Sequence, residues 1–318
     1  TDLAGANLTD AVLSERDLRS VNLTAATLSG SDLRSVSLAG TDLSGANLSG
    51  ADLSGADVTR VNLVGATLLD TDLTGANLTG AALSDLDLRS VNLTGAALAA
   101  SDLRSVNLTG MDLSGADLSD TNLTDSNLSG VNLTDSNLSG ADLHRTELSD
   151  ANLTGANLTG ANLMGANLMG ANLMGADVSH TDLTDVNLTD VNLTDVRLSD
   201  GNLSGTNLSG VKMTNANLTN ASLTGANLTD AILAGIDLTG ADLSGANLTD
   251  VDVSGANLSG ANLMGATLFG AVLKNSNLTN AILSDTDLRS VNLTGVDLSD
   301  VNLSGANLSG ANLSGANL

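Results

Sequence analysis

Two histidines, His144 and His180, are the side chains best suited to acid–base or metal chemistry in a chain of 318 residues. The chain has no cysteine, which excludes a disulfide framework and thiolate metal sites. A histidine acts as catalyst or ligand only where it meets a serine, a carboxylate or a second ligand in a cleft. What these two residues can do therefore depends on where the backbone places them.

Four aspartates form a second candidate site, because Asp185, Asp190, Asp195 and Asp200 follow one another at intervals of five residues. A hard cation such as Ca²⁺ takes six or more oxygen ligands within about 2.6 Å of one point. These carboxylates can bind a metal ion only if the backbone brings them together.

The same five-residue interval runs through the whole chain, from TDLAG at residue 1 to ANL at residue 318. Position 3 of each pentad, the centre, is Leu at 60 of 64 places; the exceptions are Val58, Val178, Met213 and Val253. Position 1 is usually Ala, Val, Ser or Thr, position 2 is usually Asp or Asn, and position 4 is usually Ser or Thr. Position 5 is Gly in 33 of the 63 complete pentads. The frame never slips.

This pattern excludes a helix and favours short strands. Five residues of α-helix rotate by roughly 140°, so the leucines would scatter around the surface, and each Gly would cost about 1 kcal/mol relative to Ala. Positions 1 and 3, in contrast, have the strand period of two and can both point inward, with position 2 outward. Positions 4 and 5 have turn chemistry.

Four strands and four corners close a square coil of 20 residues. We therefore expect an all-β solenoid without helices, with about 16 coils, stacked roughly 4.8 Å apart, as one domain over residues 1–318. A charge at the inward position 1 makes Arg16 an irregularity, which we expect to point outward or to mark a loosely wound first coil. Gly201 and Met111 are milder irregularities. Representative inward centres are Leu3, Leu8, Leu13, Leu18, Val58, Val178, Met213 and Val253.

The pattern A(D/N)LxG resembles the pentapeptide-repeat family over the entire chain. The resemblance implies a right-handed quadrilateral β-helix with the centre and the preceding small residue inside. The sequence departs from well-known members of the family in three ways: it has no Phe among its centres, no loop between coils and no terminal helix.

In such a coil the candidate chemistry does not converge. His144 and His180 fall on different faces of adjacent coils and point outward, so we expect solvated surface residues. The corners carrying Asp185, Asp190, Asp195 and Asp200 should lie on the order of 10 Å apart, too far to share one ion. We read these residues as an acidic girdle. The sequence predicts no catalytic residue, no metal site and no cofactor, and hence no enzyme.

Outward apolar residues are a candidate interaction surface, although scattered variation of the repeat is the favoured reading. Met164, Met169 and Met174 follow their centres on three successive faces, and Met264 and Phe269 do so a hundred residues later. Val64 and Leu69 occupy the same positions a hundred residues earlier.

The charge balance is 11 basic against 36 acidic residues, a net charge of −25, which argues against direct binding of a nucleic-acid backbone. The acidic residues divide among the four faces as 10, 9, 8 and 9. So even a distribution fits a solubility or high-salt adaptation better than one docking stripe. The scarcity of lysine (Lys212 and Lys274 only) is in keeping with a salt-loving organism.

Two functions are compatible with these features. The first is a non-enzymatic structural solenoid, a spacer, stalk or filament that stacks end to end, because the pattern runs in frame to both termini without polar caps. The second follows from the resemblance: members of the family mimic B-DNA and bind DNA gyrase, so a topoisomerase is the alternative partner. No apolar run approaches membrane-spanning length. The chain begins with Thr, which indicates processing, excerpting or recombinant origin.

Overall fold

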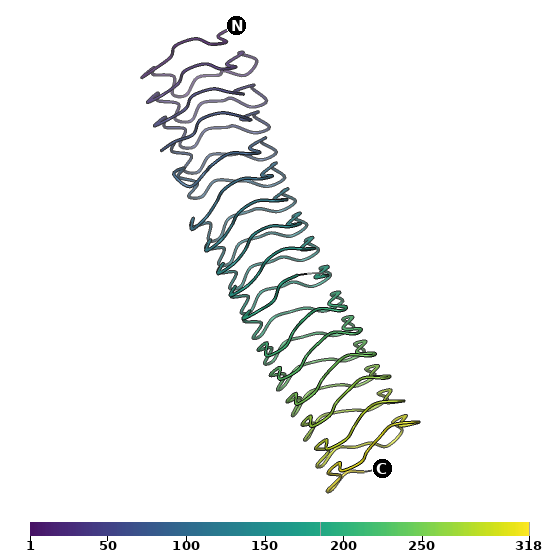
Figure 1. Cartoon of the computed structure of the whole chain (residues 1–318). Helices are drawn as coiled ribbons and strands as arrows, with labels where there is room; N and C mark the ends of the chain where they lie inside the picture. Colours follow the sequence, from purple (N-terminus) through teal and green to yellow (C-terminus); the bar gives the residue numbers. More distant parts are fainter. Residues whose placement is uncertain (185, 318) are drawn as a thin grey trace. The chain divides into compact units, whose positions relative to one another are not determined.

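The computed structural model describes residues 1–184 and 186–317, and these fall into two compact units. The first unit is Thr1–Asn152 and the second is Leu153–Leu318. Within each unit the backbone winds into four-sided coils that stack directly on one another (Figure 1). The single domain expected over 1–318 stays a prediction, and each unit is described by itself.

The coil contains 20 residues, because in most described pentads position 2 pairs in parallel with the position 2 twenty residues further on. In the first unit Asp32 pairs with Asp52, and Asp52 with Asp72. The strands are reduced to isolated bridges of this kind, each flanked by backbone hydrogen bonds: the Leu53 N–H donates to the Asp72 carbonyl at 2.7 Å, and the Asp72 N–H to the Ala51 carbonyl at 3.0 Å. Each unit is thus a right-handed quadrilateral β-helix, and the described residues contain no helix. The total of about 16 coils stays a prediction.

Four faces follow from this register. The first face comprises the pentads that begin at residue 1 and every twentieth residue after it. The second, third and fourth faces begin in the same way at residues 6, 11 and 16.

Each corner needs a left-handed residue at position 5. The glycines there have φ between 63° and 75°, a region that costs glycine nothing because it lacks a Cβ. Where glycine is absent, Asp, Asn and Ser supply most of the corners, as at Asp120 and Asn220, since their short polar side chains tolerate this conformation. The turn is closed by the next pentad, as where the Ala46 N–H donates to the Leu43 carbonyl at 2.9 Å.

The outward Asp or Asn at position 2 holds the corner from outside. Its Oδ1 accepts the N–H of position 4, as Asp42 does from Ser44 at 2.9 Å. Neighbouring asparagines also bond from coil to coil: the Asn247 Nδ2 donates to Asn227 at 3.4 Å, and the Asn227 Nδ2 to Asn207 at 3.1 Å. These bonds explain why position 2 favours Asp and Asn: the side chain replaces a backbone acceptor at a tight turn.

The interior of each unit is filled by the centres and by position 1. The four substituted centres are as buried as the leucines, at no more than 1% exposed: Val58, Val178, Met213 and Val253. The centres of the first coil are half-buried, because a coil packs against them on one side only: Leu3, Leu8, Leu13 and Leu18.

Buried hydroxyls at position 1 bond to the carbonyl groups of centres. Thr121 donates to the Leu118 carbonyl at 2.7 Å, and Thr71 reaches the Leu48 carbonyl at 2.9 Å. Ser and Thr are therefore accepted in the core, where most of their hydroxyls bond in this way. Among the described residues, the hydroxyls of Ser101 and Thr206 are buried without a hydrogen-bond partner.

Two of the three irregular residues at position 1, Arg16 and Gly201, are accommodated differently. The Arg16 side chain lies exposed while its backbone stays in the ladder, the Ser37 N–H donating to its carbonyl at 2.9 Å. Gly201 is buried, and a Cβ added there would lie 3.1 Å from the Leu198 carbonyl oxygen. Glycine thus fits this position because the coil is locally tight.

Candidate functional site

The two histidines lie in different units. His180 forms a corner of the second unit with φ of 59°, and its Nδ1 lies 3.8 Å from the Asp200 carboxylate of the next coil. His144 is a half-buried residue of the first unit whose N–H donates to Asp142 at 3.2 Å.

The acidic girdle is a set of separate corners. Asp190, Asp195 and Asp200 all have φ near 57°, and Asp185 lies outside the described residues. The Asn215 side chain donates to Asp195 at 3.2 Å, and the Asn220 side chain to Asp200 at 3.3 Å. These carboxylates therefore bond along the stack instead of around the coil. Over residues 1–184 and 186–317, no three His, Asp or Glu side chains are grouped to hold a metal ion.

The exposed methionines surround one coil of the second unit. Met164, Met169 and Met174 are 39%, 44% and 41% exposed, at the corners of three successive faces. Met264 and Phe269 occupy the first two of these corners again and are also exposed. The Arg289 guanidinium lies 5.4 Å from the centre of the Phe269 ring, a distance suited to a cation–π contact.

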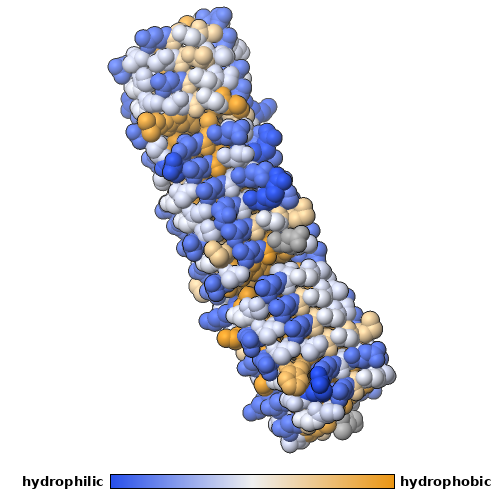
Figure 2. All heavy atoms as spheres, in the orientation of Figure 1, coloured by the Kyte–Doolittle hydropathy of each residue, from blue (hydrophilic) through white to orange (hydrophobic). Residues whose placement is uncertain are grey.

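Other exposed apolar residues sit at position 2, in the place of Asp or Asn. They were not singled out by the sequence analysis, although their position in the pentad was a sufficient signal. On the face of the molecule seen in Figure 2, hydrophilic and intermediate residues predominate, with apolar residues in patches between them. The strongly exposed residues of this kind are Val12, Ile232 and Ile282.

Arginine pairs with the carboxylate of its own pentad in the recurring segment DLRS. The Arg19 Nε and Nη2 atoms donate to Asp17 at 2.9 and 2.6 Å. These hydrogen bonds lower the pKa of Asp17 from 3.8 to about 2. Four of the five copies lie in the first unit, around Arg19, Arg34, Arg89 and Arg104; the fifth contains Arg289.

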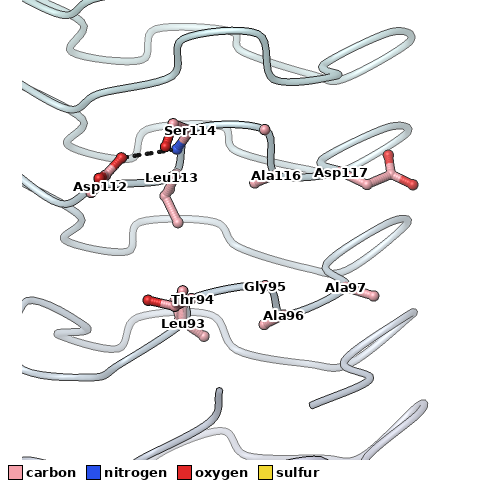
Figure 3. A pocket seen from close by; sticks show the side chains of 11 residues that line it. Leu93, Thr94, Gly95, Ala96, Ala97, Asp112, Leu113, Ser114, Ala116 and Asp117 are labelled. Atoms are coloured by element: carbon pink, nitrogen blue, oxygen red, sulfur yellow. Dashed lines mark hydrogen bonds between the residues drawn. The ribbon is translucent and has the colours of Figure 1, made fainter. Parts of the chain in front are cut away.

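In the described part of the chain, grooves lie at three places where a bridge of the ladder is missing. The first has a volume of about 270 Å³ and lies between Leu93–Ala97 and Asp112–Asp117 (Figure 3). No bridge joins Asn92 to Asp112 in the described ladder of this unit, and Met111 occupies position 1 at that place. Figure 3 shows Asp112, bonded to the Ser114 N–H, at the opposite end of the groove from Asp117. The two carboxylates do not face each other, so the groove has no paired-carboxylate chemistry.

The second groove lies one face earlier, beside Leu86. Here Ala66–Leu69 faces Asp87 and Ser90, and the Asp70 N–H donates to the Ser90 hydroxyl at 3.1 Å. In the described ladder, Asp87 forms a bridge with Asn107 of the next coil but none with Thr67 of the preceding one. Leu86 and Met111 are longer than the Ala, Val, Ser or Thr at position 1 of most other pentads. In both cases the coil separates from the preceding coil.

The third groove, in the second unit, has a volume of about 350 Å³ and lies between Val186–Thr189 and Ser204–Asn207. Its wall includes Thr206, whose Oγ1 is buried without a hydrogen-bond partner among the described residues. No oversized side chain explains this interruption.

Stacked four-sided coils with an apolar interior and an acidic surface define a β-solenoid built from five-residue repeats. The family model "Pentapeptide repeats (8 copies)" matches overlapping segments that together span residues 1–318. The chain therefore belongs to the pentapeptide repeat family.

Solved structures of the same family are similar to this chain. HetL, a pentapeptide repeat protein involved in heterocyst differentiation regulation in the cyanobacterium Nostoc sp. strain PCC 7120, shares 33% identity over 68% of this chain and 88% of its own, with a TM-score of 0.46. A pentapeptide repeat protein of the Arabidopsis thaliana thylakoid lumen shares 33% identity over 39% of this chain and 70% of its own, with a TM-score of 0.21. QnrB1, a plasmid-mediated fluoroquinolone resistance protein, shares 20% identity over 67% of this chain and 84% of its own, with a TM-score of 0.24.

A comparison with curated proteins finds no match. Among the described residues there is no helix with the length and apolarity needed to cross a bilayer.

Proposed function

We propose that the chain is a non-enzymatic structural solenoid, a scaffold or spacer whose coils can continue by stacking end to end. The observation that carries the proposal is the ladder, in which position 2 pairs with position 2 twenty residues on. Such a parallel ladder is open-ended, because a coil of the same pattern offers the same donors and acceptors to the next. Within each unit, the side chains capable of chemistry do not converge on one site. In the second unit His180 and Asp195 occupy separate corners, and in the first unit the two carboxylates of the first groove lie at its opposite ends.

Electron microscopy of the purified protein tests the proposal. We expect particles that lengthen by end-to-end joining as the protein concentration rises. Single dispersed particles at every concentration would contradict filament growth. A variant with an aspartate at a centre of the last described coils, Leu313→Asp, should block joining. The same change at an outward residue of that coil, Ser314→Asp, is the matched control.

The second candidate function is DNA mimicry directed at a topoisomerase. It is supported by the first unit, which holds 7 basic and 21 acidic residues, a net charge of −14 (7 minus 21). Its third face carries Asp32, Asp52 and Asp72 on consecutive coils, joined by bridges. Successive carboxylates are thus about 4.8 Å apart, a column of like charge on a regular repeat.

A gyrase supercoiling assay at matched ionic strength tests this function. We expect inhibition or protection at micromolar protein, and a loss of that effect in the triple variant Asp32→Asn, Asp52→Asn, Asp72→Asn. The control removes three charges from the fourth face of the same unit: Asp57→Asn, Asp117→Asn and Asp120→Asn. An unaltered gyrase reaction at micromolar wild-type protein would count heavily against the idea.

The excess of acidic residues also supports adaptation to high salt. Like charges repel one another over most of the surface, and salt screens the repulsion within a Debye length of roughly 10 Å at 0.1 M. Dilution to low salt should therefore lower the melting temperature. An unchanged or higher melting temperature would refute the adaptation.

A further inference from the structure

The third face of the second unit differs in charge from the rest of the molecule. It carries Asp195, Lys212, Asp252 and Lys274, whose charges cancel, on a chain with a net charge of −25. Both lysines of the chain lie on this one face. The third face of the first unit has one basic residue, Arg34, against six acidic ones: Glu15, Asp32, Asp52, Asp72, Asp112 and Asp135.

The central column of this neutral face carries opposite charges on the two sides of an exposed isoleucine. Position 2 reads Lys212, Ile232, Asp252 on three consecutive coils, and the bridges Lys212–Ile232 and Ile232–Asp252 fix their register. Ile232 is 48% exposed, and the lysine and the aspartate on either side of it are exposed as well.

Among the described residues of their own unit, these charges have no ion-pair partner of opposite sign. Lys212 and Asp252 are two coils apart, about 10 Å along the stack, which is too far for an ion pair. In the described part of the chain, neither Lys212, Lys274 nor Asp252 forms an ion pair, whereas Arg197 and Arg289 of the same unit do.

We propose that a second copy of this chain packs antiparallel on this face, with a two-fold axis passing beside Ile232. The axis lies in the plane of the interface, perpendicular to the stack. It therefore reverses the order of the coils in the partner subunit. Each pentad position of one subunit then lies opposite the same pentad position of the other. Ile232 then meets Ile232 of the partner subunit.

The charges pair in the same operation. Lys212 is one coil before Ile232 and Asp252 is one coil after it, so Lys212 faces Asp252 of the partner subunit. Asp195 belongs to the coil two before Ile232, and Lys274 to the coil two after it, and both lie at the same corner. Asp195 therefore faces Lys274 of the partner subunit. A two-fold interface makes each pair twice, which gives four complementary pairs around one apolar contact.

Other arrangements lose this complementarity. A parallel copy places each coil opposite the same coil, so lysine meets lysine and aspartate meets aspartate. A shift of one coil sets the charged residues against Ile232 or Asn192. A nucleic acid is disfavoured by the net charge of −25.

The size of the face determines the strength of the pair. Five coils of about 4.8 Å and strands of about three residues give a flat area of about 24 by 10 Å. This is far below the roughly 800 Å² per partner of a standard interface, so the dimer is a weak one. Sedimentation equilibrium must reach from about 10 µM to about 1 mM protein, at roughly 0.15 M salt to screen the repulsion of the two acidic chains.

Charge reversal tests the proposed pairs in the full-length protein. The wild type should show a concentration-dependent dimer. Lys212→Asp or Asp252→Lys alone creates two like-charged contacts and should weaken the dimer at least tenfold. The double variant Lys212→Asp, Asp252→Lys restores opposite charges across the axis and should return the dimer to within about threefold of the wild type.

Matched controls lie on the opposite face of the same unit. Asp242→Lys makes the same charge change as Asp252→Lys, in the same coil but on the first face, and should not weaken the dimer. Ile232→Lys should abolish dimerisation, whereas Ile282→Lys, at an exposed isoleucine of the first face, should leave it intact.

A monomer at every concentration would overturn the proposal. So would a double variant as weak as the singles, or equal weakening by the controls on the first face. Assemblies larger than the dimer that persist in the Ile232→Lys variant would be end-to-end filaments. That result would support the proposed scaffold function and overturn the antiparallel dimer.

Discussion

Two stretches of the molecule treat a large residue at position 1 in opposite ways. In the second unit Ile236 is 1% exposed and lies between Ala216 and Ala256 in an unbroken ladder. The Asp237 N–H donates to the Ala216 carbonyl at 2.9 Å, and the Asn257 N–H to the Ile236 carbonyl at 2.9 Å. In the first unit Leu86 stands at the edge of a groove.

The difference indicates that the distance to which a side chain extends from the backbone (its reach) matters more than its volume for the stacking of coils. Isoleucine branches at Cβ and keeps its bulk beside the backbone, whereas leucine branches one atom further out. Met111, unbranched and longer still, stands at the other interrupted step of the first unit. Core exposure rises at these places: Leu93 and Ala96 reach 5% and Ala66 reaches 8%, against 0–1% for most of the core.

The largest effect is expected from emptying the core of the unbroken stretch. Leu238 is 1% exposed, and Leu238→Ala should cost about 3–4 kcal/mol in local stability because the tightly stacked neighbours cannot collapse into the cavity. Leu93→Ala, beside the first groove, should cost about 2 kcal/mol or less. Native-state hydrogen exchange of each coil measures the two. Equal losses would mean that the groove does not loosen its surroundings.

An artificial interruption should follow from lengthening position 1 in an intact stretch. Ala226 is fully buried, and the N–H of the next residue, Asn227, donates to the Thr206 carbonyl of the preceding coil at 3.0 Å. Ala226→Leu should cost about 1–3 kcal/mol by overpacking and expose the Asn227 amide to exchange. Ala226→Ile, of equal volume but branched at Cβ, should keep that amide protected. If both variants behave alike, volume and not reach is the controlling property.

The reverse change should close an existing groove. Leu86→Val restores the usual size at position 1, so the Leu68 and Asp87 amides should gain protection from exchange. We expect a gain in stability of about 1 kcal/mol, the sum of a few new backbone hydrogen bonds less the apolar surface lost. Val106→Ala, one coil further on the same face, serves as the control and should destabilise. No gain in amide protection would show that Leu86 is not the wedge.

The smallest effect concerns the arginine pairs that are concentrated in the first unit. The pKa of Asp17 is lowered to about 2 by the hydrogen bonds from Arg19. A folded-state pKa below that of the unfolded chain adds stability that is complete above the unfolded value and is lost as the pH falls through about 2.

Arg19→Ala should therefore raise the pKa of Asp17 toward 3.8, which NMR titration of the carboxyl carbon measures. Arg16→Ala removes a nearby exposed arginine that has no ion pair with Asp17 and is the control. An equal rise in both variants would assign the shift to the general field and not to the bidentate pair.

The five-residue period was enough to predict the coil, its inward centres and its outward carboxylates, because one strand-and-corner unit recurs without a slip. Burial of Val58, Met213 and Val253 follows from that frame alone. The grooves could not be predicted from the frame, although Met111 was recognised as irregular. The frame predicts that Leu86 points inward, but it does not predict whether the neighbouring coils can pack around that side chain. The counts of acid per face likewise concealed the neutral column of Lys212 and Asp252, because they summed both units and ignored the basic residues.

The open ladder has a mechanical consequence. A coil peeled from either unit by a pulling force releases 20 residues at once, which extends the tether by roughly 65 Å at about 3.3 Å per residue. Coils joined by complete ladders should yield at similar forces, so a stretching trace becomes a regular staircase. The coils beside Leu86, Met111 and Thr206 should unfold at the lowest forces. Their steps would therefore appear first in the force–extension trace.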